Sequence, residues 1–527
     1  MVLWISFEAL CIITPLLLWG LYWYCTMTFN YWKKKRIHYI EPVILFGNIK
    51  DRALFRTSFH EFQKELYRRF DGHKYAGFYE GRQPVLMIRD PELIKLIMIR
   101  DFEHFVDRAT LGLSSSPYFK NMLINIKGQQ WKNLRALMTP TFSSGKLKAM
   151  EILVEQCGQQ LGTFLQNETG NKNRDDKCTE LEMKELFGRF TLDVIATCAF
   201  GVQCDSLKDR NAEFVKTAAR FNDISLLNRL LIFFVILFCR QYARFFPIRG
   251  VNRQAMAFLV DVLKKTVEHR RQHKEQKWND FLQLMIDAAA QERGERSDEK
   301  QDINDTKQTS ATVLNEETII AQSLLFLLAG FETSSTLLTY ASYELALNQD
   351  IQQKLRKEVE DVLGKYGGHC SYEALLEMTY LEMVLLESLR KYPPVARVDR
   401  ACTQPYIIPG TNIELEVGTS VCIPILGLHH DPQYYPQPEV FDPNRFTPAQ
   451  KLTRSPYVFL PFGSGPRNCI GTRFALMTTK IAMVHLIKDF CLQPSMKTDV
   501  PLKFSKFSTF LKAENGVWLN IKRNTEI

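Results

Sequence analysis

The twelve cysteines of this 527-residue chain include no Cys-x-x-Cys pair and have no regular spacing. The sequence therefore predicts neither a disulfide framework nor a zinc cluster, and most of the thiols are expected to be buried as small apolar groups. No internal repeat is present, and no dense basic patch has interleaved aromatic residues, which argues against a nucleic-acid partner. No Gly-x-Gly-x-x-Gly loop follows a strand-like segment, so the chain lacks that type of NADPH site.

The composition is that of a globular protein, with 46% hydrophobic and 24% charged residues, and a chain of this length can bury a large core. The net charge is +9, and part of it lies in the run of three lysines and one arginine at residues 33–36. Such a surface could dock an acidic partner protein or an anionic membrane face.

The N-terminal residues 2–27 are apolar and aromatic, and they are long enough to span a bilayer as a helix. The basic run follows directly, and positive residues stay on the cytoplasmic side. A cleaved signal peptide would instead carry its charge before the apolar run. We therefore expect a membrane anchor at residues 1–30 and a catalytic domain at residues 31–527 that faces the cytosol.

Helical periodicity dominates the rest of the chain, most clearly at residues 147–165 and 181–200. Residues 319–347 are apolar nearly all round and follow an acidic helix start at Asn315, which predicts a long buried helix. Residues 75–89 predict strands around a turn, residues 291–312 a polar surface loop, and residues 395–426 further β structure. The expected fold is mainly α with small β-sheets.

A ten-residue apolar run at positions 230–239 is flanked by Arg229 and Arg240. It is too short to span a membrane. Two interpretations stay open: a buried helix, or a segment that inserts into the surface of the bilayer and admits hydrophobic substrates.

A glycine-rich loop with one cysteine occupies residues 462–471, which read FGSGPRNCIG. Its three glycines allow the backbone to pass close to a flat group. Cys469 lies just before an expected helix at residues 472–490, so the helix dipole should lower the pKa of its thiol. The alternative, non-functional interpretation is a glycine-rich loop with an unreactive cysteine.

This loop resembles, position by position, the haem-binding loop of the cytochrome P450 family. The resemblance implies that Cys469 is the thiolate ligand of the iron of haem b (iron protoporphyrin IX). Phe462 would pack against the macrocycle and keep water from the sulfur, and Arg467 would reach a haem propionate. It also implies a single haem-thiolate fold behind an N-terminal transmembrane helix.

A second motif, Ala329-Gly330-Phe331-Glu332-Thr333, lies midway along the expected buried helix. Thr333 can donate to a carbonyl one turn earlier and loosen the helix, and Gly330 would open space beside Ala329. The motif resembles the oxygen-activation motif of the family. By that resemblance Thr333 helps to deliver protons, and Glu332 supports the relay.

Glu387 and Arg390 are spaced i, i+3 in a largely apolar helical segment, which favours a buried ion pair. The pair resembles the Glu-x-x-Arg pair of the family, which locks with an arginine in the segment at residues 441–446. Arg445 is present there, although Asn444 stands where the family often has Glu. The implied role of this triad is core assembly and haem loading.

Trp131 and Arg135 are spaced i, i+4 and share a helix face. Both side chains are only donors, which suits an anionic propionate, and the family has a Trp-x-x-x-Arg at this point. Arg397, which follows a Pro-Pro-Val-Ala stretch, is a further candidate for a propionate.

Residues 101–108 and 139–148 are similar to insect microsomal enzymes that oxidise plant toxins and insecticides, and to vertebrate drug-metabolising relatives. The resemblance implies a monooxygenase that inserts one oxygen atom of O2 into a hydrophobic substrate. Electrons would come from NADPH through NADPH-cytochrome P450 reductase, with cytochrome b5 as a further partner. The chain would sit in the endoplasmic reticulum membrane.

Other functions are compatible with parts of this pattern. A hormone or lipid hydroxylase has the same motifs. A haem-thiolate isomerase that needs no reductase tends to lack a threonine at position 333, and a haem sensor would leave the oxygen-activation motif unexplained. The segments expected to line the pocket are largely apolar, which predicts a hydrophobic substrate; they are residues 110–126, 221–246, 326–333, 395–400 and 504–510.

Overall fold

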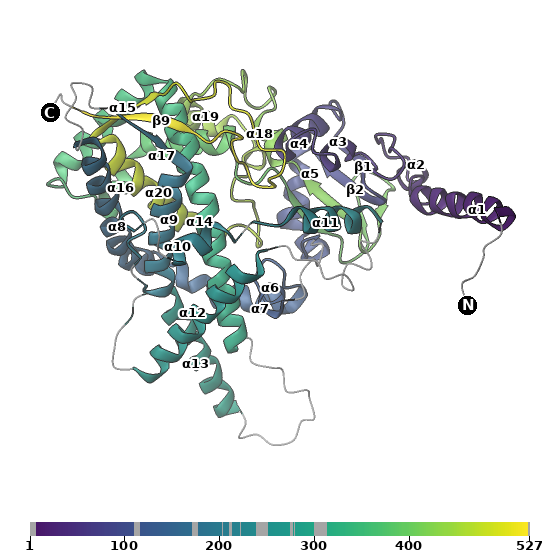
Figure 1. Ribbon diagram of the computed structural model, residues 1–527, viewed down its shortest axis with the longest axis horizontal. Helices are drawn as coiled ribbons and strands as arrows, with labels where there is room; N and C mark the ends of the chain where they lie inside the picture. The colour runs from purple at the N-terminus through teal and green to yellow at the C-terminus, as the bar shows by residue number, and fades with distance from the viewer. Residues whose placement is uncertain are drawn as a thin grey trace.

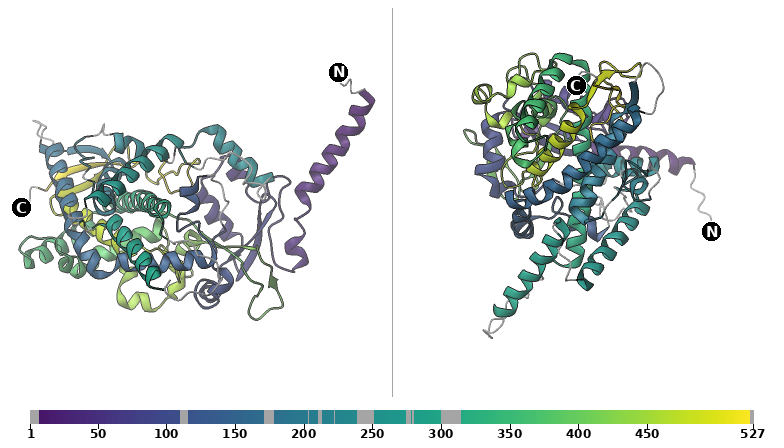
Figure 2. Two further views of the ribbon diagram at one scale, coloured as in Figure 1. Left: turned by 90° about the horizontal axis from the view of Figure 1, so that it is seen from below. Right: turned by 90° about the vertical axis from the view of Figure 1, so that its left-hand side faces the viewer.

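The computed structural model consists of a helical domain with small sheets near both of its ends and an N-terminal helix that projects from it (Figures 1 and 2). This arrangement confirms the expected fold class. The structure describes residues 7–109, 116–170, 178–202, 204–209, 213–221, 223–238, 251–273, 278, 280–299 and 314–524.

The α-helices in chain order are α1 (Phe7–Thr26), α2 (Tyr31–Lys34), α3 (Lys50–Ala53), α4 (Phe59–Arg68), α5 (Pro91–Lys95), α6 (Pro117–Lys120), α7 (Gly128–Met138), α8 (Ser144–Gly170), α9 (Met183–Phe200), α10 (Glu213–Ala219), α11 (Leu226–Phe238), α12 (Arg253–Gln272), α13 (Phe281–Glu299), α14 (Glu316–Leu347), α15 (Gln349–Lys365), α16 (Tyr372–Glu377), α17 (Thr379–Lys391), α18 (Ile425–His429), α19 (Pro448–Leu452) and α20 (Thr472–Ile487). A π-helix, η1 (Leu96–Arg100), continues α5. Short 3-10 turns are η2 (Phe102–Phe105), η3 (Thr139–Phe142), η5 (Pro443–Phe446) and η6 (Pro456–Val458).

The strands form three small sheets. The largest has the order β1-β2-β7-β4, with β2 and β7 parallel and the other pairs antiparallel. A second sheet has the order β3-β9-β8, and β5 pairs with β6 alone. The bounds are β1 (Tyr75–Glu80), β2 (Gln83–Ile88), β3 (Cys178–Glu182), β4 (Val398–Ala401), β5 (Tyr406–Ile407), β6 (Glu414–Leu415), β7 (Ser420–Ile423), β8 (Phe490–Pro494) and β9 (Trp518–Arg523).

Helix α14 crosses the domain and is buried along most of its length, as its apolar sequence predicts. It begins where expected, because the side chain of Asn315 caps it by accepting the N–H of Thr318 at 2.8 Å. It packs against α9, α17 and α20. The central helix therefore lies between the elements that carry the other motifs.

Helix α1 extends away from the domain, and its described side chains from Ile12 onward are largely exposed (Figure 1). Among the described residues, α14 is the one helix long and apolar enough to cross a membrane by composition, but 56% of its apolar window is buried, as in a core helix. Residues Ile12–Thr26 of α1 and helix α11 form shorter apolar helices.

Two expectations about local structure need correction. The polar stretch at residues 291–312 was expected to be a loop, but α13 continues to Glu299, because Glu, Arg and Ala are good helix formers. The start of the segment at residues 181–200 belongs to β3, and the helix begins at Met183. Parts of two further predictions lie outside the described residues: the pocket lining at residues 110–115 and 239–246, and the polar loop at residues 300–312.

Candidate functional site

The cysteine loop turns tightly between η6 and α20. The N–H of Cys469 donates to the carbonyl oxygen of Phe462 at 2.8 Å, which closes the loop. Gly463 and Gly465 both have φ of 70°, where side chains are strongly disfavoured. A Cβ on Gly465 would also lie 1.9 Å from the main-chain oxygen of Met98. The glycine at position 465 thus permits the loop to press against η1.

Cys469 precedes the first turn of α20, and the hydroxyl of Thr472 donates to its carbonyl oxygen at 3.0 Å. The pKa of the thiol was expected to be lowered, but burial raises it. The N–H of Gly471, the hydroxyl of Thr472 and the guanidinium groups of Arg135 and Arg108 act in the opposite direction. Burial of the thiol therefore outweighs these hydrogen bonds and positive charges.

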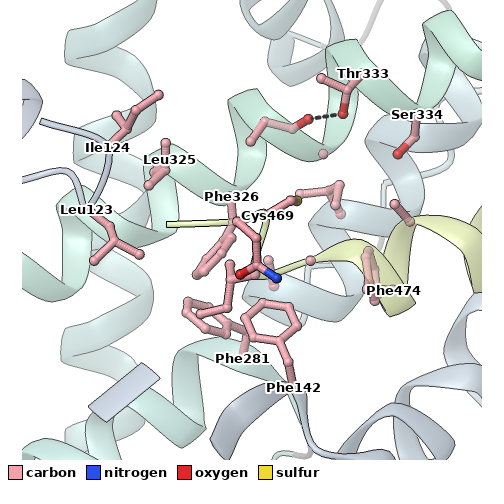
Figure 3. A pocket seen from close by; sticks show the side chains of 18 of the residues that line it. Leu123, Ile124, Phe142, Phe281, Leu325, Phe326, Thr333, Ser334, Cys469 and Phe474 are labelled. Atoms are coloured by element: carbon pink, nitrogen blue, oxygen red, sulfur yellow. Dashed lines mark hydrogen bonds between the residues drawn. The ribbon is translucent and has the colours of Figure 1, made fainter. Parts of the chain in front are cut away.

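A cavity of about 230 Å³ lies between α14 and the cysteine loop. Figure 3 shows Cys469 and Thr333 on the same cavity, with Phe142, Phe281 and Phe326 around it.

The three phenylalanines form one aromatic wall of this cavity. The ring centroids of Phe281 and Phe326 are 4.0 Å apart in an edge-to-face contact, and Phe142 lies 5.4 Å from Phe326. Such ring pairs are favourable beyond the area that they bury. The wall suits a large, flat, apolar group.

Thr333 donates its hydroxyl to the carbonyl oxygen of Ala329 at 2.5 Å, as its position in the buried helix predicts (Figure 3). Thr333, Ala329 and Gly330 all line the cavity. A Cβ on Gly330 would lie 2.4 Å from Cδ1 of Ile195 on α9. The glycine allows α9 and α14 to pack closely.

Glu332 was expected beside Thr333 in the relay, but it is not among the described residues that line the cavity. Its carboxylate pairs with Lys184 at 3.0 Å. The ammonium of Lys184 also donates to Ser335 and Thr336, at 2.8 and 2.7 Å. Successive helix residues point about 100° apart, so Glu332 faces α9 while Thr333 faces the cavity.

Trp131 and Arg135 share one face of α7, as predicted, and both line the cavity together with Arg467. The guanidinium of Arg467 lies over the Trp131 ring, 4.2 Å from its centroid. Arg135 donates to the carbonyl and side-chain oxygens of Asn468, at 3.1 and 2.8 Å.

The side chain of Phe462 is half-buried in the core and is not part of the described lining.

Arg108 also lines the cavity, and the positive charge of Arg400 lies close to that of Arg108; neither arginine was predicted as a site residue. Burial, together with the positive charge of Arg108, lowers the pKa of both Arg400 and Arg467 to about 9. The Nε atoms of Arg108, Arg400 and Arg467 are buried and have no hydrogen-bond acceptor within the described part of the chain. A buried cluster of cations with free donors requires an anion.

Arg397 has a different environment from the one predicted. Its guanidinium pairs with Glu80 at 2.6 Å and with Asp399 at 3.2 Å, and these two carboxylates raise its pKa. Neither Arg397 nor Arg400 belongs to the described lining of the cavity, and Nη1 of Arg397, like Nε of Arg400, has no acceptor within the described residues. The charge of Arg397 is balanced by two carboxylates, so Arg400 is the better candidate for an anion.

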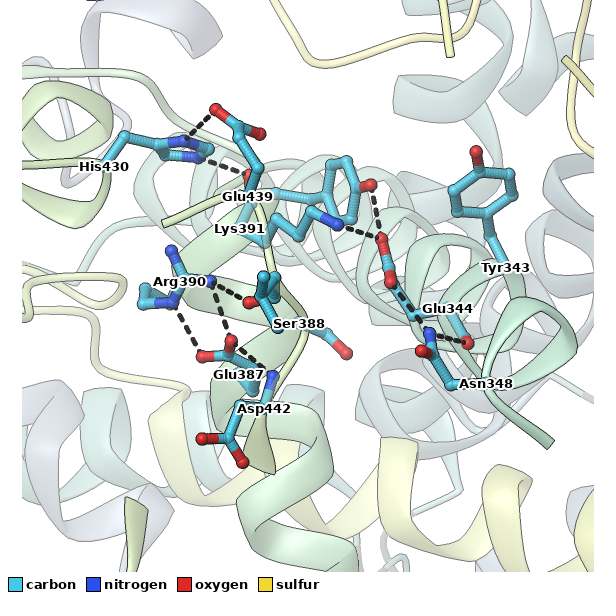
Figure 4. Close-up of polar contacts among 12 residues, drawn as sticks. Tyr343, Glu344, Asn348, Glu387, Ser388, Arg390, Lys391, His430, Glu439 and Asp442 are labelled. Carbon is cyan, nitrogen blue, oxygen red and sulfur yellow. Dashed lines mark hydrogen bonds and ion pairs between the residues drawn. The ribbon is translucent and has the colours of Figure 1, made fainter. Parts of the chain in front are cut away.

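The triad of Glu387, Arg390 and Arg445 forms as predicted. Arg390 and Glu387 make two hydrogen bonds of 2.7 Å, and both side chains are fully buried (Figure 4). Nε of Arg445 lies 3.5 Å from the same carboxylate, and the N–H of Asp442 donates to it at 3.0 Å. The triad thus joins α17 to η5.

The chain matches the family model described as "Cytochrome P450" over residues 38–520. The chain belongs to the cytochrome P450 family. It is 39% identical over 514 residues to "Cytochrome P450 9e2" of Blattella germanica, covering 95% of each chain. It is 36% identical to "Cytochrome P450 6k1" of the same organism, covering 98% of this chain and 97% of the relative. "Probable cytochrome P450 6a14" of Drosophila melanogaster is 36% identical, with 94% and 96% covered.

Membership confirms that the protein is a haem-dependent monooxygenase of the oxidoreductase class. The residues of the cavity fit the cofactor. The thiol of Cys469 supplies a soft ligand for iron, and the phenylalanine wall suits the face and edge of the macrocycle. The unpaired donors of Arg108, Arg400 and Arg467 match the two propionates.

Proposed function

We propose that this cytochrome P450 oxidises hydrophobic foreign compounds, such as plant toxins or insecticides. The observation that carries the proposal is the apolar cavity between Thr333 and the Cys469 loop, together with the similarity to insect relatives over nearly the whole chain. A hydroxylase of endogenous hormones or lipids is the alternative, because the same cavity would take such substrates.

Within this proposal, each site residue has a defined role in binding the cofactor or in the reaction. Haem b supplies oxygen activation, and the Cys469 thiolate donates electron density to its iron. Trp131, Arg135 and Arg467 hold the propionates, together with Arg108 and Arg400. Thr333 would hold a proton at the cavity, where its hydroxyl already has a carbonyl acceptor. Glu332 holds the buried ammonium of Lys184.

We propose that electrons come from NADPH through NADPH-cytochrome P450 reductase, with cytochrome b5 as a second donor. Reconstitution of the protein with reductase and NADPH tests this donor. Product that depends on both supports a monooxygenase with this partner. Product that forms without either would favour the isomerase type of reaction.

Residues 1–30 are proposed to anchor the protein in the endoplasmic reticulum membrane, with residues 31–527 in the cytosol. Helix α11 supports contact with lipid beyond the anchor, because Leu227 is 80% exposed and Leu230 and Phe234 are about half exposed. Of the two interpretations of this run, the exposed apolar face favours insertion into the surface of the bilayer. Protease treatment of sealed microsomes should digest the catalytic domain, and a protected domain would contradict this topology.

The substrate class is tested by binding spectra. The reconstituted protein is titrated with plant toxins, insecticides, fatty acids and steroids, and the shift of the Soret band reports entry into the cavity. Tight binding and turnover of toxins or insecticides support the proposal. Selective binding of a steroid or fatty acid would favour the hormone or lipid hydroxylase.

A further inference from the structure

Gln322 lies on α14, two turns before the oxygen-activation motif, and its side chain is fully buried. Its carbonyl Oε1 accepts the N–H of Leu123 at 2.8 Å. Its amide Nε2 donates to the carbonyl oxygen of Asn121 at 2.6 Å. One side chain therefore binds two main-chain groups that are about two hundred residues away in the sequence.

The segment that Gln322 holds, residues 121–126, has turns but no regular helix or strand. Buried main-chain groups need hydrogen-bond partners, and in this segment a side chain provides them. The other end of the segment is also tied down, because Arg467 donates to the carbonyl oxygen of Ile126 at 2.8 Å. The segment is thus fixed at one end by α14 and at the other by the cysteine loop.

Between these two attachments, the side chains of Leu123 and Ile124 line the cavity. Figure 3 shows both beside Leu325 of α14. The position of this apolar wall therefore depends on hydrogen bonds to residues outside the segment itself. A wall that is already in place when a ligand arrives costs less to order upon binding.

We propose that Gln322 is a positioning residue for substrate selectivity: by holding Asn121 and Leu123, it sets the place of the Leu123–Ile124 wall over the haem. Gln322 itself does not line the cavity within the described residues. Its effect is therefore exerted through the wall, and it should depend on the size of the ligand.

The test uses the full-length holoenzyme and two azole probes that bind the haem iron, imidazole and 4-phenylimidazole. Gln322→Leu replaces the amide with an apolar side chain that is one atom shorter, and it removes both hydrogen bonds. We expect it to weaken 4-phenylimidazole binding about tenfold, or about 1.4 kcal/mol, and to leave imidazole within about twofold, since a small ligand does not reach the wall.

Ser323→Ala is the matched control. Ser323 is also fully buried on α14, but its hydroxyl donates to Ile319 of the same helix at 2.9 Å. It should leave the ratio of the two dissociation constants unchanged. An unchanged ratio in Gln322→Leu, or an equal loss for both azoles, would overturn the proposal.

A second variant and a second measurement apply if Gln322→Leu does not fold. Gln322→Met has a side chain of similar length and removes both hydrogen bonds, so it should shift the ratio in the same direction as Gln322→Leu. In the unmodified holoenzyme, the Leu123 amide should exchange with solvent as slowly as the core of α14. Rapid exchange of that amide, or an unchanged ratio in Gln322→Met, would overturn the proposal.

Discussion

Arg390 donates one guanidinium hydrogen to the main-chain oxygen of His429 at 3.0 Å. The ring of His429, which is fully buried, in turn accepts the N–H of Leu460 through Nε2 at 2.9 Å. The carbonyl of Leu460 accepts the N–H of Gly463 at 3.0 Å. The buried triad is thus connected by hydrogen bonds to the loop that carries Cys469.

Glu387→Gln should strongly destabilise the protein. The change leaves the charge of Arg390 buried without its partner, which costs about 3–5 kcal/mol. The free energy of unfolding and the fraction of purified protein that contains haem would measure it. Glu65→Gln on α4 is the control, since Glu65 and its partner Arg69 are both more than half exposed, and the change should cost below about 1 kcal/mol. Equal losses in the two variants would contradict this assignment.

Cys469→Ala should abolish the Soret band of the thiolate–carbonyl complex. Cys198 also lines the cavity, so Cys198→Ala is the natural control. Burial raises the pKa of Cys198 well above its ordinary value, and the neighbouring Cys157 and Asp280 raise it further, whereas Cys469 has two arginines that oppose its shift. We expect the band to persist in Cys198→Ala. An unchanged band in Cys469→Ala would refute the ligand assignment.

Arg400→Leu should accelerate haem loss by about ten- to a hundredfold, because a hydrogen bond to a charged group is worth about 1.5–3 kcal/mol. Transfer of haem to an excess of apomyoglobin measures the rate. Arg397→Leu should instead lower stability, since it leaves Glu80 without its ion pair, with little change in the rate of haem loss from the folded protein. The reverse pattern would assign the propionate to Arg397.

Thr333→Ala should uncouple NADPH use from product, with more of the electrons lost to hydrogen peroxide. The variant removes the hydroxyl that donates to Ala329. Thr333→Ser keeps that hydroxyl and should retain most of the coupling. The ratio of product to NADPH consumed is the measurement, and full coupling in the alanine variant would remove Thr333 from proton delivery.

Acid should destabilise the fold through His429. Burial, with the charge of Arg390, lowers the pKa of this histidine to about 3, below its ordinary value of about 6.5. Between pH 6.5 and pH 3, this histidine is therefore protonated in the unfolded chain and neutral in the folded chain. Above pH 6.5 it does not change the free energy of unfolding, and at pH 5 it lowers that free energy by about 2 kcal/mol.

His429→Gln removes this titration and keeps an acceptor for Leu460 near the position of Nε2. The difference in the free energy of unfolding between pH 7 and pH 5 should become smaller in this variant. Part of the pH dependence should remain, because burial also lowers the pKa of His60, to about 4. A pH dependence equal to that of the unmodified protein would show that His429 does not contribute.

The features that sequence alone predicted well are local ones. The Cys469 loop, the capped start of α14 and the spacing of Trp131 with Arg135 depend on residues within about one turn of each other. The Glu387–Arg390 pair is also local, and the apolar segment around it was enough to predict burial. Helical spacing fixes which side chains share a face, so these predictions needed no tertiary information.

The features that sequence missed depend on contacts between distant segments. Arg397 and Arg400 are three residues apart at the start of β4, and side chains at such a spacing in extended chain face opposite sides. Only the pairing of β4 with β7, and the approach of Glu80 from β1, decide which arginine is paired with a carboxylate. The direction of Glu332 was likewise decided by Lys184 on α9.

The contact between Gly465 and Met98 bears on how the enzyme is made in the cell. Met98 leaves the ribosome early, whereas Gly465 emerges among the last tenth or so of the 527 residues. The cavity is lined by residues from Arg108 to Ala475. It cannot be complete until the ribosome has synthesised the chain as far as Ala475. Stable capture of haem is therefore a step that follows translation of nearly the whole polypeptide, and the supply of haem can act on a finished apoprotein.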